Sequence, residues 1–239
     1  MRHLGLFAKF WEAGKVKTRL AATIGPIPAR DIYLRFLHHL IHRFDSSADC
    51  RDLVYTPAIR HAEFASIAGE RWSLVPQVSG GLGVRMRSFF ETAFSDSPPK
   101  THGHSSSIAH RVVIIGADSP QLDPALIEHA FVELLTNDAV IGPSCDGGYY
   151  LIGFRDRCLN VFENIEWSTP TVFAETEKQL QQLNINYATL PSQMDIDDWP
   201  ALAGSLKQFA ASTDPDLQRL EQEIQLILGS SDALGRSIS

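Results

Sequence analysis

Residues 112–118 are Val112-Val113-Ile114-Ile115-Gly116-Ala117-Asp118, four uncharged β-branched side chains in a row, followed by two small residues and a carboxylate. A continuous apolar run of this length is typical of a strand that is buried on both faces of a parallel sheet. Ligands of open parallel sheets bind outside the carboxyl ends of the strands. The stretch therefore predicts the centre of the fold and, at Asp118, one position of its site.

Hydrophobic periodicity on either side of this stretch alternates between strand and helix. We expect further strands at residues 3–8, 53–55, 72–78, 139–142, 149–154 and 187–190. We expect helices at residues 29–44, 59–68, 84–94, 124–135, 170–183 and 215–228, with Asp123, Asp214 and either Ser168 or Thr169 as caps. This order predicts an α/β fold with a mainly parallel, mixed, Rossmann-like sheet and helices on both faces.

The composition is that of a globular protein. The chain has 239 residues, of which 44% are hydrophobic, and a formal net charge of -7. These values exclude bulk disorder and argue against a dedicated nucleic-acid binder, which is usually basic. No apolar run approaches the ~20 residues of a membrane span. We expect one domain over residues 1–228, a mobile insertion at 95–110 and a frayed tail at 229–239.

Cysteine usage favours a reducing compartment. The chain has three cysteines at irregular spacing and no Cys-x-x-Cys pair, so a disulfide framework is not indicated. We therefore expect a cytoplasmic protein without a nucleic-acid or membrane partner. The sequence does not determine the oligomeric state.

Positive charge is concentrated near the N-terminus. Residues 1–20 carry five Lys and Arg against one Glu, a net charge of +4 in an acidic chain. A basic loop after the first strand is suited to phosphate oxygens, although a solvated surface loop is the competing interpretation. The loop lacks both the Gly-x-Gly-x-x-Gly fingerprint and the P-loop pattern, which disfavours a dinucleotide oxidoreductase and a P-loop NTPase.

Asp118 is the leading candidate for a metal ligand. A carboxylate at a strand end near a phosphate loop provides the oxygen ligands that Mg²⁺ or Mn²⁺ requires. A turn-stabilising aspartate is the alternative. Asp123 lies before Pro124 and is better explained as a helix cap.

Five motifs occur in order along the chain. They are Lys9…Gly14…Lys17-Thr18-Arg19-Leu20, Gly116-Ala117-Asp118-Ser119-Pro120, Pro143-Ser144-Cys145-Asp146-Gly147-Gly148-Tyr149, Trp167-Ser168-Thr169 and Asp195-Ile196-Asp197-Asp198. Together they resemble a bacterial glycosyltransferase-like family associated with radical-SAM selenodomain proteins. That family lies within the nucleotide-diphosphate-sugar transferase superfamily, and the resemblance implies its GT-A fold.

The resemblance also implies roles for individual residues. Nucleotide phosphates would be bound by Lys9, Gly14, Lys15, Lys17 and Arg19, with Gln77, Gly80 and Gly81 near the base. Asp118 would bind the metal together with Asp197, for which Asp195 and Asp198 are alternatives, as is an acidic turn before a helix. The second substrate would contact Asp146, Gly147, Gly148 and Tyr149, although the two glycines equally suit a hairpin turn. Catalytic roles would fall to Lys17, Asp118 and Asp146, the last as a hydroxyl ligand or base.

Three functions fit these motifs. The resemblance favours a metal-dependent glycosyltransferase that binds a nucleotide-sugar and a small-molecule acceptor. The Lys17-Thr18-Arg19-Leu20 stretch resembles that of phospholactate guanylyltransferases and favours a nucleotidyltransferase. A catalytically silent nucleotide-binding module is the third. One departure concerns the loop's shape, because Phe10-Trp11 stand where the family usually has a small residue and a proline.

Overall fold

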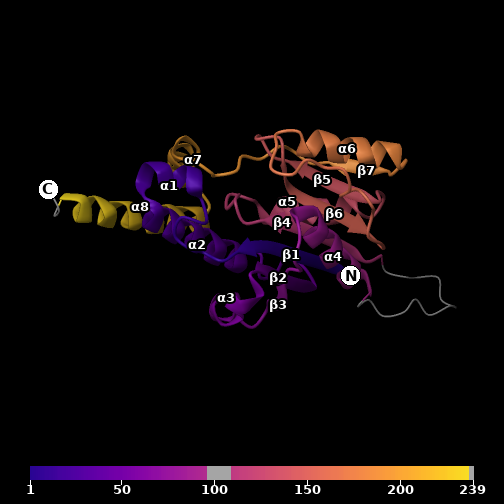
Figure 1. The fold of residues 1–239 in the computed structure, drawn as a ribbon, viewed down its shortest axis with the longest axis horizontal. Coiled ribbons are helices and arrows are strands. Elements are labelled where there is room, and N and C mark those ends of the chain that lie inside the picture. Colours follow the sequence, from indigo (N-terminus) through magenta and orange to yellow (C-terminus); the bar gives the residue numbers. More distant parts are fainter. Residues whose placement is uncertain (96–108, 237–239) are drawn as a thin grey trace.

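The computed structural model describes residues 1–95 and 109–236, with side chains described as far as residue 230 (Figure 1). Its centre is a seven-stranded sheet in the order β3-β2-β1-β4-β6-β5-β7. The strands are β1 (Arg2–Lys9), β2 (Cys50–Thr56), β3 (Ser73–Pro76), β4 (Arg111–Gly116), β5 (Ala139–Pro143), β6 (Tyr149–Arg155) and β7 (Tyr187–Thr189). Only β6 among these strands is antiparallel to its neighbours, so β1, β2, β3 and β4 all end at one edge of the sheet.

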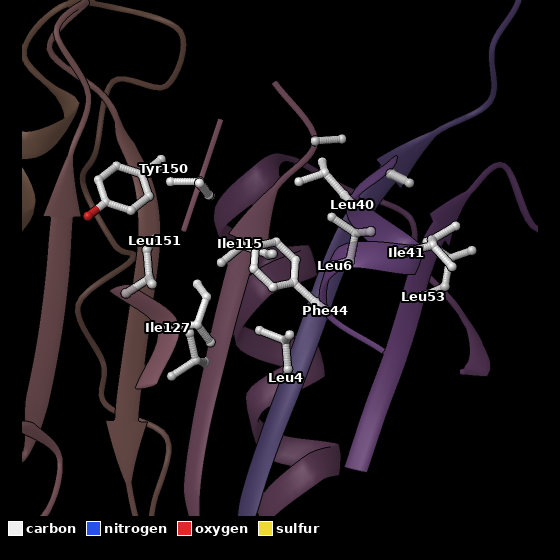
Figure 2. Close-up of a cluster of buried hydrophobic side chains, with 14 of the residues drawn as sticks. Leu4, Leu6, Leu40, Ile41, Phe44, Leu53, Ile115, Ile127, Tyr150 and Leu151 are labelled. Carbon is white, nitrogen blue, oxygen red and sulfur yellow. The ribbon is translucent and has the colours of Figure 1, made fainter. Parts of the chain in front are cut away.

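Helices cover both faces of the sheet. They are α1 (Thr18–Ile24), α2 (Pro26–Arg43), α3 (His61–Ala68), α4 (Leu82–Ser95), α5 (Pro124–Glu133), α6 (Val172–Gln182), α7 (Trp199–Ala211) and α8 (Pro215–Arg236), with a 3-10 turn at Ala58–Arg60. One face packs against α2, α3 and α5, and Figure 2 shows part of this cluster, including Leu6, Leu40 and Ile115. The other face packs against α4 and α6. The expected α/β architecture, a mainly parallel mixed sheet between helices, is confirmed.

The central strand β4 explains this layering. Val113 and Ile115 belong to the first cluster, whereas Val112 and Ile114 belong to the second. All four side chains are at most 4% exposed. Because successive strand residues point to opposite faces, a strand apolar at every position must be covered twice.

A third cluster lies beyond the end of the sheet, where α1, α2, α7 and α8 pack together (Figure 1). Two of these helices were not expected from the sequence. The basic loop ends at Lys17 rather than Leu20, since α1 begins at Thr18, and α7 follows the acidic cluster. Helix α8 continues through Gly229 to Arg236, where the sequence predicts a frayed tail, because a glycine costs only about 1 kcal/mol in a helix.

Other sequence expectations have mixed outcomes. Asp123 caps α5, since its Oδ1 accepts the amide hydrogen of Ala125 at 2.8 Å. The expected cap of α6 at Ser168 or Thr169 is wrong, because the helix begins at Val172 and Ser168 has a φ of 67°. Residues 96–108, most of the insertion expected at 95–110, lie outside the described residues. Among the described helices, none is long and apolar enough to span a membrane.

Candidate functional site

Segments distant in sequence meet at the carboxyl edge of the parallel strands. The loop from Lys9 to Lys17 follows β1, and Asp118 follows β4, the neighbouring strand. A late segment joins them, because the Ile196 amide donates to the Asp118 carbonyl at 3.0 Å. This bond holds Asp197 beside Asp118 although 79 residues separate them in the chain.

Lys17 is the centre of this arrangement. Its ammonium forms ion pairs with Oδ1 of Asp118 and, at 2.9 Å, with Oδ1 of Asp197. The Lys17 side chain is only 2% exposed, whereas those of Asp118 and Asp197 are 49% and 39% exposed. The lysine is thus the buried partner of two carboxylates that face solvent.

The charge of Lys17 is secured by these partners. Burial on its own lowers the pKa of Lys17, but the carboxylates of Asp118 and Asp197 outweigh it and raise the pKa above its ordinary value. The ammonium also lies 5.6 Å from the ring centroid of the buried Phe36, a weaker attraction. Lys17 therefore stays protonated at neutral pH.

The three late aspartates have different partners. Asp197 pairs with Lys17, and Asp195 accepts a hydrogen bond from the Ser119 hydroxyl through its Oδ1. Asp198 caps α7, because its Oδ1 accepts the amide hydrogen of Ala201 at 2.9 Å. Of the alternatives left open by the sequence, the geometry brings Asp197 to Asp118 and gives Asp198 a structural contact.

Around Lys17 lies a pocket of about 320 Å³, which we call the lysine pocket. Lys15 and Arg19 are exposed at this pocket, and Lys9 donates from Nζ to the Lys15 carbonyl at 2.9 Å. The basic loop thus presents its cations on the same side as Asp118. The lining residues are Lys9, Lys15, Val16, Lys17, Thr18, Arg19, Tyr33, Asp118 and Asp197.

A larger hollow of about 550 Å³, which we call the acidic hollow, adjoins the lysine pocket and shares Arg19, Asp118 and Asp197 with it. Four carboxylates and a single guanidinium line it. Its residues are Arg19, Leu82, Asp118, Ser144, Asp146, Gly148, Tyr149, Trp167, Ser168, Thr169, Pro170, Val172, Asp195 and Asp197. Lys17 and Arg19 balance part of this charge, and the hollow keeps a net negative charge.

This concentration of negative charge affects Asp195. Burial, together with the neighbouring carboxylates of Asp118, Asp146 and Asp197, raises the pKa of Asp195 to about 6, although the Ser119 hydrogen bond acts in the opposite direction. In the part of the chain that the structure describes, these side chains form no group of three or more arranged to hold a metal ion alone. A metal at Asp118 and Asp197 would need oxygens from a ligand as well.

The β5–β6 hairpin forms one wall of the acidic hollow. Oδ1 of Asp146 accepts from the Ser144 hydroxyl at 2.5 Å and from the Gly148 amide at 3.0 Å, which fixes the carboxylate in the turn. Gly147 has a φ of 90°, and a Cβ there would lie 2.0 Å from the Pro170 carbonyl oxygen. The geometry thus fits the turn interpretation of the two glycines, and of the two only Gly148 lines the hollow.

Two aromatic residues, Tyr149 and Trp167, complete the wall, and both belong to motifs of the sequence. Tyr149 packs edge-on against Trp167 with ring centroids 6.5 Å apart. The indole of Trp167 also lies against Gly83, where a Cβ would be 2.7 Å from Cζ2. The motif Trp167-Ser168-Thr169 does not by itself indicate what Trp167 contacts, and Tyr33 of the lysine pocket has no local sequence signal because it lies on a helix face.

Other residues expected near a nucleotide lie apart from these pockets. Gln77 donates from Nε2 to the Val54 carbonyl at 2.8 Å and accepts from Arg85 at 3.3 Å, so it ties strand ends to α4. Gly80 accepts a hydrogen bond from Arg85, and Gly81 is exposed just before α4. Neither these three residues nor Gly14, which has a φ of 77°, lines the two pockets.

Phe10 and Trp11, the departure from the family pattern, have a packing explanation. Their rings lie 4.9 Å apart and both contact Phe64 of α3. The guanidinium of Arg60 lies 4.3 Å above the Phe10 ring. The aromatic pair thus anchors the start of the basic loop to α3.

Comparisons with known proteins agree with this fold. Residues 42–169, more than half of the chain, match the family described as "Uncharacterized protein conserved in bacteria (DUF2064)". A solved structure of a candidate nucleotide-diphospho-sugar transferase from Desulfovibrio desulfuricans G20 is 28% identical, with a TM-score of 0.80 over 96% of this chain and 97% of that one. No curated protein sequence matches the chain.

Two enzymes share the fold at lower identity. A 4-diphosphocytidyl-2C-methyl-D-erythritol synthase from Anaerococcus prevotii DSM 20548 is 9% identical, with a TM-score of 0.55 over 85% of this chain and 95% of that one. The inositol-1-phosphate CTP transferase from T. maritima is 12% identical, with a TM-score of 0.50 over 94% and 96%. The expected superfamily fold is thereby confirmed, whereas the association with radical-SAM proteins stays a prediction.

Proposed function

The chain belongs to the DUF2064 family, and we propose that it is a metal-dependent transferase that binds a nucleotide-sugar and passes the sugar to a hydroxyl of a small acceptor. The observation that carries this proposal is the convergence of Asp118 and Asp197 on one buried cation, Lys17, beside a loop of exposed cations. The similar structure from Desulfovibrio desulfuricans, described as a candidate nucleotide-diphospho-sugar transferase, supports the same class.

The lysine pocket is the proposed diphosphate site. Lys15 and Arg19 are exposed there and have the charge to bind phosphate oxygens, Arg19 with a planar fork and Lys15 as a mobile point charge. Lys9 supports the loop through the Lys15 carbonyl. Stabilising the charge that builds on a leaving diphosphate is the main catalytic requirement of this chemistry.

A divalent ion fits the same place. Asp118 and Asp197 each direct an oxygen to a single cation-sized position, and their side chains are accessible from solvent. Mg²⁺ in proteins is commonly held by one or two carboxylates together with substrate phosphates. We propose Mg²⁺ or Mn²⁺ as the ion, which when bound would neutralise charge on the leaving diphosphate.

The acidic hollow is the proposed acceptor site. Two of its carboxylates, Asp146 and Asp195, neither pair with Lys17 nor belong to the proposed metal site; they repel a phosphorylated acceptor and offer hydrogen-bond acceptors to the hydroxyls of a neutral, sugar-like one. Trp167 provides an apolar ring beside them. This lining favours transfer to a hydroxyl over attack by a phosphate group.

The proposed reaction follows from this division. The acceptor oxygen forms a bond to the anomeric carbon while the bond from that carbon to the diphosphate breaks, and the nucleoside diphosphate leaves with the electron pair. The proton of the acceptor hydroxyl passes to a carboxylate of the hollow. Asp146 is our candidate for this base, because hydrogen bonds from Ser144 and Gly148 fix its orientation at the wall.

Nucleotidyl transfer is the second candidate. The Lys17-Thr18-Arg19-Leu20 stretch, which resembles that of phospholactate guanylyltransferases, favours it. In that reaction a phosphorylated or hydroxylated substrate would attack the α-phosphate of a nucleoside triphosphate and release pyrophosphate.

The products of turnover distinguish these functions. The protein would be incubated with Mn²⁺, a mixture of simple sugars and polyols, and either nucleotide-sugars or α-labelled nucleoside triphosphates. We expect nucleoside diphosphate from the nucleotide-sugars, abolished in Asp118→Asn. Pyrophosphate from the triphosphates would instead support nucleotidyl transfer, and nucleotide binding without turnover would indicate a binding module.

A further inference from the structure

We propose that Lys17 is a resident substitute for the divalent ion, so that metal enters only in exchange for the lysine ammonium when nucleotide phosphates arrive. In the nucleotide-free protein the ammonium holds Asp118 and Asp197 together. The phosphates then offer the displaced ammonium a new anionic partner. This inference rests on the proposed function and adds an order of events to it.

The contacts of Lys17 are those of a cation held between ligands. It pairs with one oxygen of Asp118 and one of Asp197, which are 79 residues apart in the chain. The lysine approaches from the protein interior and is nearly inaccessible, whereas both carboxylates are open to solvent. An incoming ion can therefore reach the carboxylates without passing the lysine.

The backbone is arranged to place this side chain. Lys17 has φ 47° and ψ 46°, the left-handed region that residues with a Cβ rarely adopt. It stands immediately before α1, and its carbonyl accepts the first hydrogen bond of that helix, from Ala21 at 2.8 Å. Strain of this kind persists where surrounding contacts compensate for it, as at many functional sites.

Charge explains why metal and nucleotide should bind together. With the ammonium in place, the two carboxylates carry only one uncompensated negative charge, and a divalent ion meets repulsion from Lys17. Phosphate oxygens bound at Lys15 and Arg19 would attract both the ion and the released ammonium. By linkage, nucleotide raises metal affinity and metal raises nucleotide affinity by the same factor.

The test measures Mn²⁺ binding by the electron paramagnetic resonance of the free ion, first without nucleotide and then with UDP or GDP. The variants are Lys17→Met and Lys17→Gln, which remove the charge at the site. Lys15→Met is the matched control for the nucleotide-free measurement alone, because it removes the same charge from the exposed part of the same loop and Lys15 belongs to the proposed phosphate site. Thermal unfolding of each variant checks that it is folded.

Without nucleotide, we expect both Lys17 variants to bind Mn²⁺ at least about tenfold more tightly than the wild type or Lys15→Met, since a nearby positive charge is gone. With UDP or GDP, the wild type should gain Mn²⁺ affinity and the Lys17 variants should gain less. Equal nucleotide-free Mn²⁺ affinity in the wild type and the folded Lys17 variants would overturn the inference. It would also be overturned if Lys15→Met increased nucleotide-free Mn²⁺ affinity as much as the Lys17 variants do.

The same data separate the inference from the proposed function. Suppose that nucleotide raises the Mn²⁺ affinity of the wild type but the Lys17 variants bind Mn²⁺ alone no better than the wild type. The proposal that Lys17 occupies the position of the ion is then wrong, and the proposed function keeps its support. If the Lys17 variants bind Mn²⁺ alone more tightly but no nucleoside diphosphate affects the wild type, the cation position is supported and the proposed nucleotide chemistry is overturned.

Discussion

The lysine pocket and the acidic hollow are neighbours of opposite construction. In the lysine pocket the defining groups are cations of the basic loop and of the first turn of α1, and two of them, Lys15 and Arg19, are exposed. In the acidic hollow the wall is a tight hairpin in which Asp146 is fixed by two hydrogen bonds and Gly147 is pressed against Pro170. The lysine pocket therefore depends on exposed charged side chains, and the acidic hollow depends on the fixed shape of the hairpin.

The two halves meet at Asp118, Asp197 and Arg19, which line both. A substitution at these shared residues should affect both ligands, whereas a substitution at Lys15 or Asp146 should affect one. The difference teaches that effects on stability and on affinity can be separated. Substitutions of the hairpin glycines should mainly lower the free energy of unfolding, and substitutions in the basic loop should mainly lower ligand affinity.

The largest effect on stability is expected from Gly147→Ala. A Cβ at this position would overlap the Pro170 carbonyl oxygen, a backbone atom that cannot rotate away, and φ is 90°. We expect the free energy of unfolding to fall by about 3 kcal/mol, measured by urea denaturation. Gly148→Ala is the control, because its Cβ would meet only the side-chain ends of Ser144 and Asp146 at 3.1 and 3.2 Å. Equal losses in the two variants would mean that the wall is not rigid.

A large effect on affinity is expected from Asp118→Asn. The variant keeps the size of the side chain but loses the charge that, in our proposal, binds the ion. Metal-dependent nucleotide affinity should fall on the order of a hundredfold, since a site with two carboxylates loses half of the negative charge that the protein supplies to the ion. Mn²⁺ titration in the presence of UDP measures it.

Asp123→Asn serves as the matched control for this change. Asp123 caps α5 through Oδ1, a role that asparagine fills equally well. Its Mn²⁺ affinity should equal that of the wild type. Unchanged Mn²⁺ affinity in Asp118→Asn as well would remove Asp118 from the proposed metal site.

The sequence predicted those parts of the molecule that depend on local pattern. The apolar run 112–116 predicted β4, and the cations between Lys9 and Arg19 predicted a charged loop at the same edge. Both signals are contained in short segments. The position of Asp118 at the end of a strand then followed from the rule for parallel sheets.

The remaining features depend on long-range contacts. Nothing in the local sequence distinguishes Asp195 from Asp197. The hydrogen bond from the Ile196 amide to the Asp118 carbonyl is a long-range contact, and it determines that Asp197 pairs with Lys17 beside Asp118. Gln77 is a polar residue after a strand, as a ligand-binding residue often is, but its amide is taken by the Val54 carbonyl. In contrast, the cap at Asp198 had a local signal, a proline two residues later, that was available in the sequence.

A smaller effect, on pH dependence, is expected at His39, which supports the turn carrying Asp118. Its Nε2 donates to the Pro120 carbonyl at 3.0 Å. Burial, together with the charge of Arg43, lowers the pKa of His39 to about 4, although Asp214, Asp216 and the Pro120 carbonyl act in the opposite direction. The neutral ring is therefore the stable form.

Protonation of His39 destabilises the folded protein. Because its pKa in the folded state lies below the ordinary value of about 6.5, the contribution of neutral His39 to the free energy of unfolding is present above pH 6.5 and is lost as the pH falls toward 4. Between pH 7 and pH 5 the loss should be about 2 kcal/mol. His39→Gln keeps a donor and should flatten this part of the stability curve, measured by urea denaturation at each pH. His42→Gln, at an exposed position of the same helix, is the control, and an equally flattened curve in that variant would contradict the assignment to His39.

The smallest expected effect distinguishes the two halves directly. Arg19→Ala removes an exposed guanidinium that borders both pockets, and Asp146→Asn removes a charge from the hollow alone. Affinity for UDP or GDP with Mn²⁺ should fall about tenfold in Arg19→Ala, because a charge-assisted phosphate contact is lost. The affinity should also depend less on salt concentration, since one screened ion pair is missing.

Asp146→Asn should leave nucleotide affinity within about twofold and reduce turnover instead, as its charge faces the proposed acceptor. Isothermal titration at two salt concentrations, together with product release, measures both. If nucleotide affinity responded equally to the two substitutions, the division of the site into a phosphate half and an acceptor half would be wrong, because charge in the hollow would then be acting on the nucleotide.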